Sequence, residues 1–148
     1  VYEHADLVEK EMAMKSIALI ALTTISLMGA EGYTVYKNYC MKCHVEMMTK
    51  AEVIQSIKTL KAPPMVEVAN KIKGNIRIVD EDMDIKRRVV IAFVKDYIDN
   101  PSLQYSMCDP MALEKFGVMP SLKGKLNEIQ KQAVAEWIYD NYEGKTFK

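Results

Sequence analysis

The chain has 148 residues, enough for one domain with a single hydrophobic core and a short extension, so large multidomain enzymes are excluded. Hydrophobic residues make up 49% of it and charged residues 27%, with 6 glycines and 5 prolines, which excludes collagen-like and disordered chains. Because 20 basic side chains are balanced by 20 acidic ones, the composition gives no electrostatic footprint for nucleic acid, and we expect no such partner.

The N-terminal region has the pattern of an export signal. Lys15 precedes an apolar run over residues 17–28, and the small residues Gly29 and Ala30 follow it. We expect cleavage after Ala30, which makes residues 14–30 a signal peptide and places the mature domain in the periplasm.

Residues 1–13 are acidic where a signal needs positive charge, and they precede a second start candidate, Met14. We interpret them as a non-native or mis-assigned extension. Residues 31–148 then form the mature domain. The alternative is that residues 17–28 stay in place as an uncleaved anchor, in which case the protein would contact a membrane.

Helix signals recur along the mature chain, whereas strand alternation is confined to the short stretch 76–79. The sequence therefore predicts an all-α fold. The expected helices cover residues 49–60, 65–73, 80–98, 109–117 and 127–142.

Local residue chemistry sets these boundaries. Thr49 with Glu52 has the spacing of a capping box, and Asn127 with Gln130 resembles another. Asp109 is expected to cap a helix that begins at Pro110. Apolar residues recur at helical spacing in two of the helices, at 89, 90, 93, 94, 97 and 98 and at 129, 133, 134, 137 and 138.

One motif, Cys40-Met41-Lys42-Cys43-His44, carries chemistry. Its two thiols are spaced to add to the two vinyl groups of haem, and the adjacent imidazole can ligate iron. We therefore expect one covalently attached haem c. The alternatives are a Cys40–Cys43 disulfide, a thioredoxin-like redox pair and half of a zinc site. The last two are disfavoured because no βαβ pattern surrounds the motif and no second Cys/His pair exists.

Residues 32–142 resemble the class I cytochromes c, which are small single-haem electron carriers. Besides the haem motif, Gly32 and Tyr36 stand eight and four residues before Cys40, and residues 134–138 are similar to the family's last helix. The resemblance implies the cytochrome c fold, in which several short helices wrap around one haem. It also implies that the first and last helices cross at Gly32, Tyr36 and Trp137, and it counts Tyr36 among the cofactor-binding residues.

The resemblance also suggests the residues around the iron. His44 would be one ligand, and its second ring nitrogen would donate a hydrogen bond to a proline carbonyl. We assign this carbonyl to Pro63, and Pro64 stays an open alternative. The other interpretation of these prolines is a plain helix stop. The stretch 117–120 resembles the family's ligand loop and makes Met119 the sixth ligand. The reserve candidates are Met65 and Met111. Bis-histidine ligation is excluded because residues 31–148 hold no histidine besides His44.

The function implied is one-electron exchange with respiratory donor and acceptor proteins by a monomer that is not an enzyme. Five lysines are expected near the haem edge, Lys42, Lys61, Lys115, Lys123 and Lys125. They could steer acidic partners or simply form a solvated surface. Two alternatives are a membrane-anchored subunit of a respiratory complex and a haem-based gas sensor with an open iron site. Cys108, left over once Cys40 and Cys43 bind haem, is either a buried thiol or a site of intermolecular pairing.

Overall fold

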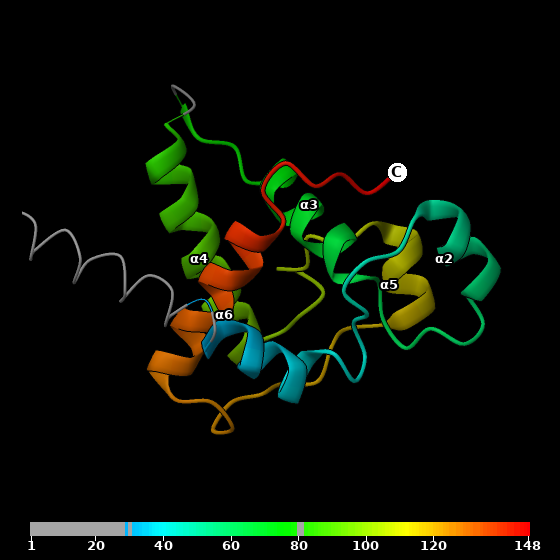
Figure 1. Ribbon diagram of the computed structural model, residues 1–148, viewed down its shortest axis with the longest axis horizontal. Coiled ribbons are helices and arrows are strands. Elements are labelled where there is room, and N and C mark those ends of the chain that lie inside the picture. Colours follow the sequence, from blue (N-terminus) through cyan, green and yellow to red (C-terminus); the bar gives the residue numbers. More distant parts are fainter. Residues whose placement is uncertain (1–28, 30, 80–81) are drawn as a thin grey trace, which may run out of the picture.

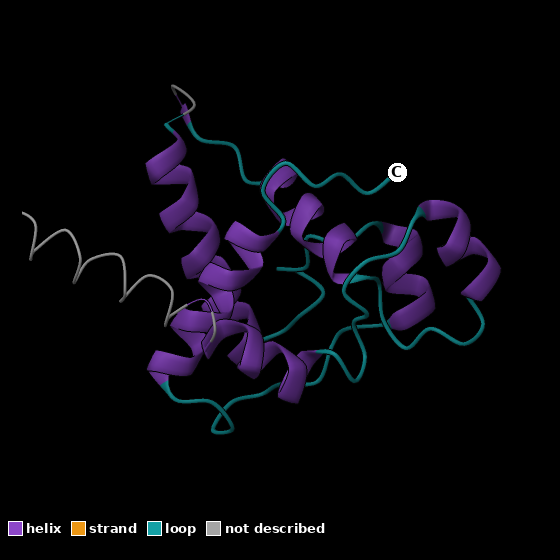
Figure 2. Cartoon of the chain, viewed as in Figure 1, coloured by secondary structure: helices purple, strands orange, loops and turns teal. Residues whose placement is uncertain are grey.

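The computed structural model describes residue 29 and residues 31–79 and 82–148 (Figure 1). In this part of the chain the regular structure is helical and no strand is present, which confirms the all-α expectation (Figure 2). Residues 31–35 are α-helical and run directly into a π-helical turn, η1. The named elements are η1 (Tyr36–Cys40), α2 (Lys50–Ser56), α3 (Met65–Asn75), α4 (Met83–Asp99), α5 (Pro110–Phe116) and α6 (Glu128–Asn141).

The predicted helix starts at Thr49 and Asn127 are confirmed. Each side chain accepts a hydrogen bond from the amide three residues on, and the side chains of Glu52 and Gln130 accept one from the cap residue's own amide. α2 is shorter than expected and ends at Ser56. α3 runs through Gly74 to Asn75, because a glycine within a helix lowers its stability without ending it.

The expected cap at Asp109 is wrong. Its side chain makes no capping hydrogen bond to α5 and instead forms an ion pair with Lys71 of α3, 2.7 Å between Nζ and Oδ2. Pro110 still opens the helix, because its fixed φ suits the first helical position. Gly117 ends it at φ +68°, as expected for a glycine just past the last turn.

The core lies where α4 packs along α6 (Figure 1). The buried face of α6 begins at Lys131, recurs at Val134, Ala135 and Ile138, and continues to Tyr142 just past the end of the helix. Ile129, predicted to be on this face, is 69% exposed because it stands two positions off this series. Val89 of α4 is 40% exposed because it lies on the opposite side of the helix from the buried series Val90, Ile91, Val94 and Ile98.

The expected crossing of the first described helix with α6 is confirmed. A Cβ atom added to Gly32 would lie 2.6 Å from Cβ of Trp137 and closer still to the carbonyl oxygen of Ala133. The Tyr36 ring stacks on Trp137 with 4.6 Å between ring centroids. The two backbones can approach this closely because Gly32 has no side chain.

The described residues contain no helix that is long and apolar enough to cross a bilayer. The expected extension 1–13, the apolar run 17–28 and the cleavage position Ala30 lie outside these residues.

Candidate functional site

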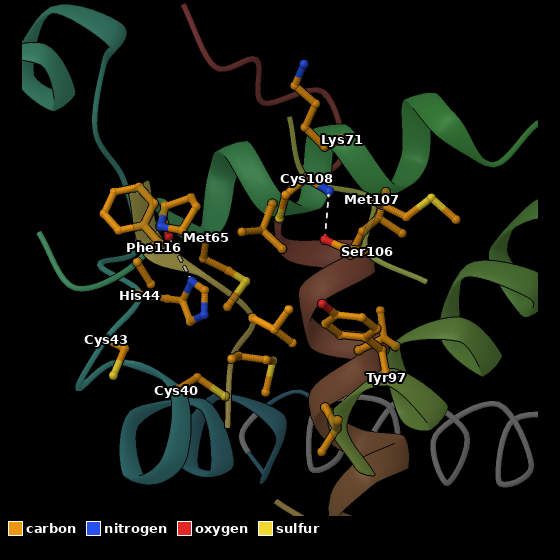
Figure 3. Close-up of a pocket in the computed structure, with 18 of the residues that line it drawn as sticks. Cys40, Cys43, His44, Met65, Lys71, Tyr97, Ser106, Met107, Cys108 and Phe116 are labelled. Carbon is orange, nitrogen blue, oxygen red and sulfur yellow. Dashed lines mark hydrogen bonds between the residues drawn. The ribbon is translucent and has the colours of Figure 1, made fainter. Parts of the chain in front are cut away.

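The haem motif begins at the end of η1. The Met41 amide donates to the carbonyl of Tyr36 at 2.9 Å, which closes a π-type turn, and π-turns occur frequently at functional sites. The amides of Cys43 and His44 then both donate to the carbonyl of Cys40, at 3.0 and 2.9 Å. This tight turn brings Cys40, Cys43 and His44 into the wall of one pocket (Figure 3).

A single cavity collects five of the six predicted cofactor-binding residues, Cys40, Cys43, His44, Pro63 and Met119. The rest of its wall is mostly apolar and comes from α3, α4, the segment 106–122 and α6; it includes Met65, Val68, Ile72, Phe93, Val94, Ile98, Leu113, Phe116, Leu122 and Ile138. Its only charged lining residues in the described part of the chain are two lysines, Lys61 and Lys71. An apolar wall of this kind suits a large, flat hydrophobic group.

The His44 ring is oriented by a backbone carbonyl. Its Nδ1 lies 2.8 Å from the oxygen of Pro63, and because a carbonyl can only accept, Nδ1 carries the proton. Burial lowers the pKa of His44, and the bond to Pro63 partly opposes this shift. Burial therefore favours the neutral imidazole, in which Nε2 keeps a lone pair for a metal.

Pro63 rather than Pro64 provides this carbonyl. The carbonyl of Pro64 accepts the amides of Glu67 and Val68, at 3.0 and 3.1 Å, and so belongs to the first turn of α3. Pro63 is thus the histidine's acceptor and Pro64 precedes the first turn of α3. The plain helix stop is not supported, because α2 already ends at Ser56.

The geometry does not favour the non-haem interpretations of the two motif cysteines. Cys40 and Cys43 are free thiols. Burial, with a smaller contribution from Cys43, raises the pKa of the Cys40 thiol to about 11, whereas catalytic redox pairs have a thiol of lowered pKa. No group of three or more His, Cys, Asp or Glu side chains among the described residues could hold a metal ion, which argues against a zinc site.

Met119 is half-buried in the cavity wall and packs against the core. The residues that follow it are tied to the end of α4: the Leu122 amide donates to the carbonyl of Ile98 at 2.9 Å. The Ser121 hydroxyl donates to the carbonyl of Asp99 at 2.6 Å. Of the two reserve candidates, Met65 is buried and lines the cavity, whereas Met111 is 79% exposed and does not.

Tyr36, the sixth predicted cofactor-binding residue, does not line the cavity. Its side chain is fully buried against Trp137, because its position on the helix faces α6. The hydroxyl donates to the backbone carbonyl of His44 at 2.6 Å, so Tyr36 contacts the histidine's backbone from outside the cavity.

Sequence reasoning missed three residues of the wall, Ser106, Met107 and Cys108 (Figure 3). They belong to the stretch between α4 and α5, and the only signal for them in the sequence was Cys108, left over once Cys40 and Cys43 were assigned to haem. Cys108 is half-buried there, and burial raises the pKa of its thiol. The five lysines expected around the haem edge are all exposed, and Lys61 lies on the cavity wall itself.

No protein-family model and no solved structure matches the chain. An uncharacterized protein of Aquifex aeolicus (strain VF5) is 39% identical to it over 120 residues, which cover 76% of this chain and 74% of that protein. The chain therefore belongs to the same family as this Aquifex protein.

Proposed function

We propose that this protein is a single-haem c-type cytochrome that exchanges one electron at a time with redox partner proteins. The observation that carries the proposal is one apolar cavity that gathers two thiols, a neutral imidazole and a thioether. These are the groups that covalent haem attachment and His/Met ligation require. The cytochrome c fold is part of the same proposal.

The residues present fit the cofactor. The thiols of Cys40 and Cys43 would each add S–H across a vinyl C=C bond, a step that balances without an oxidant or reductant. Nε2 of His44 and the sulfur of Met119 would hold the iron. When bound, haem supplies reversible Fe(III)/Fe(II) exchange.

The chain's own groups set the properties of such a site. The Pro63 carbonyl holds the Nδ1 proton of His44, which fixes the ring and makes Nε2 a better donor. A thioether ligand and an apolar wall both favour the reduced state, so a moderately positive potential is expected. If His44 and Met119 both hold the iron, no ligand site on it would remain for a substrate, so the site would exchange electrons rather than catalyse a reaction.

The partners follow from charge and location. We propose that the protein is a periplasmic monomer that contacts a membrane only if its N-terminal segment is uncleaved. The exposed lysines Lys42, Lys61, Lys115, Lys123 and Lys125 would steer acidic faces of donor and acceptor proteins toward the haem edge. A reaction rate that does not fall as ionic strength rises would remove this steering.

The test is production in a host that attaches haem c, followed by intact mass and visible spectra of both oxidation states. The expected mass is the polypeptide plus one haem. Cys40→Ser should leave at most one thioether bond, while Cys108→Ser is the matched control that keeps both. A bare polypeptide mass in wild-type protein would overturn the proposal. Carbon monoxide binding by the reduced native protein would instead favour an open iron site and gas sensing.

A further inference from the structure

The two largest fully buried side chains of the described structure, Tyr36 and Tyr142, both donate hydrogen bonds to the loop that follows the haem motif. The Tyr36 hydroxyl donates to the carbonyl of His44 at 2.6 Å. The Tyr142 hydroxyl, which lies just after α6, donates to the carbonyl of Glu46 at 3.1 Å. Burial raises the pKa of each hydroxyl above its ordinary value, so both remain protonated donors.

The start of α3 holds the same loop from another side. The Met65 amide donates to the carbonyl of Val45 at 2.8 Å, and the Val66 amide donates to that of Glu46 at 3.2 Å. These amides belong to the first turn of a helix, where N–H groups have no partner within the helix. Three successive carbonyls, from His44 to Glu46, are thus fixed by η1, by α3 and by Tyr142, the residue that follows α6.

A ring contact couples the two tyrosines. Trp137 stacks on Tyr36 at 4.6 Å and meets Tyr142 edge-on at 5.8 Å between centroids. Phenylalanine in place of either tyrosine would provide the same ring packing against Trp137. The hydroxyls are needed for a different reason: a carbonyl buried without a donor is costly.

We infer that Tyr36 and Tyr142 are positioning residues for the His44 imidazole, holding the backbone of the ligand so that its Nδ1 stays on Pro63. This inference rests on the proposed function for its effect on iron, though the anchoring of the loop stands without it. Losing the Tyr36 hydroxyl removes the donor to the His44 carbonyl, and losing the Tyr142 hydroxyl leaves the Glu46 carbonyl with the Val66 amide alone. Either loss loosens the loop and lets the His44–Pro63 bond lengthen. A weaker bond makes the imidazole a poorer donor, which destabilises Fe(III) relative to Fe(II).

The experiment compares Tyr36→Phe and Tyr142→Phe with Tyr139→Phe in the full chain. Tyr139 is also buried on α6, but it makes none of the hydrogen bonds to the carbonyls of residues 44–46. The first readout is hydrogen exchange of the Met65 and Val66 amides. We expect exchange to accelerate roughly tenfold in the first two variants, which corresponds to about 1.4 kcal/mol, and to change little in the control.

The second readout is the reduction potential of the haem-loaded variants. We expect it to rise for Tyr36→Phe and Tyr142→Phe and to stay at the wild-type value for Tyr139→Phe. The inference is overturned if all three variants share the same potential and the same amide exchange, because the hydroxyls would then contribute packing alone. If wild-type protein carries no haem, the proposed function fails, and the exchange measurement still decides whether the tyrosines anchor the loop.

Discussion

Replacing Gly32 by alanine tests the close approach of the first described helix to α6. The added Cβ would lie 2.6 Å from Cβ of Trp137, whereas carbon atoms in contact normally stand about 3.5–4.0 Å apart. The helix containing residues 31–35 must therefore move away from α6 by about 1 Å. That movement would also separate Tyr36 from Trp137, whose rings stack across the crossing.

The expected cost follows from two opposing terms. Overpacking of a well-packed contact costs about 1–3 kcal/mol and occasionally more. Alanine in a helix gains about 1 kcal/mol over glycine. Because the clash involves a backbone carbonyl, which cannot rotate away as a flexible side chain can, we expect the upper part of the range to apply. The free energy of unfolding should fall by about 2 kcal/mol.

Urea unfolding followed by far-ultraviolet circular dichroism measures this change. Gly74→Ala is the matched control, because Gly74 also lies in a helix and an added Cβ there meets nothing within 4 Å. The control should gain about 0.5–1 kcal/mol. If Gly32→Ala is stabilised as much as the control, the helices do not cross at Gly32 as described.

Three further predictions concern charge and ligation. Lys131→Met should lower the urea midpoint more than Arg87→Met does. Lys131 is buried against Asp99 at 2.6 Å, so its loss leaves a carboxylate without its partner. The exposed ion pair of Arg87 with Asp140 is worth less than about 1 kcal/mol. Burial raises the pKa of Glu67, so its charged form opposes folding; Glu67→Gln should stabilise the protein at pH 7, and the gain should vanish below about pH 4, where the carboxyl is protonated in both states. Met119→Ala should make the reduced protein bind carbon monoxide, as visible spectra would show; failure to bind would assign the sixth ligand to another residue.

The sequence predicts this fold best where the signal is local. The caps at Thr49 and Asn127 depend on residues three positions apart, and both are present as expected. At Asp109 the local signal gave a wrong prediction of a side-chain cap. Its carboxylate had a competing partner 38 positions away, Lys71, and a charged partner outcompeted the helix amides.

In the candidate site, too, the residues that depend on local spacing could be predicted and those that depend on distant contacts could not. The spacing of Cys40, Cys43 and His44 could be taken from the sequence because the chemistry acts within one turn of chain. The role of Tyr142 could not, since its acceptor is Glu46, 96 positions earlier, and a tyrosine at a helix end has many possible uses. Tyr36 was found as part of a helix crossing, but its hydroxyl bond to His44 depends on how the chain turns after Cys40.

The two sides of the cavity are held unequally, and this bears on how the proposed site would respond to strain. The loop of His44 is fixed by two hydroxyls and two amides, in addition to the bond from its ring to Pro63. The Met119 side is held at Ser121 and Leu122, two and three residues beyond the sulfur-bearing residue, by bonds to the end of α4. Lys131 in turn fixes that end through the Asp99 carboxylate. A perturbation of the Asp99–Lys131 pair should therefore reach Met119 before it reaches His44, so that the thioether would be the first ligand to loosen.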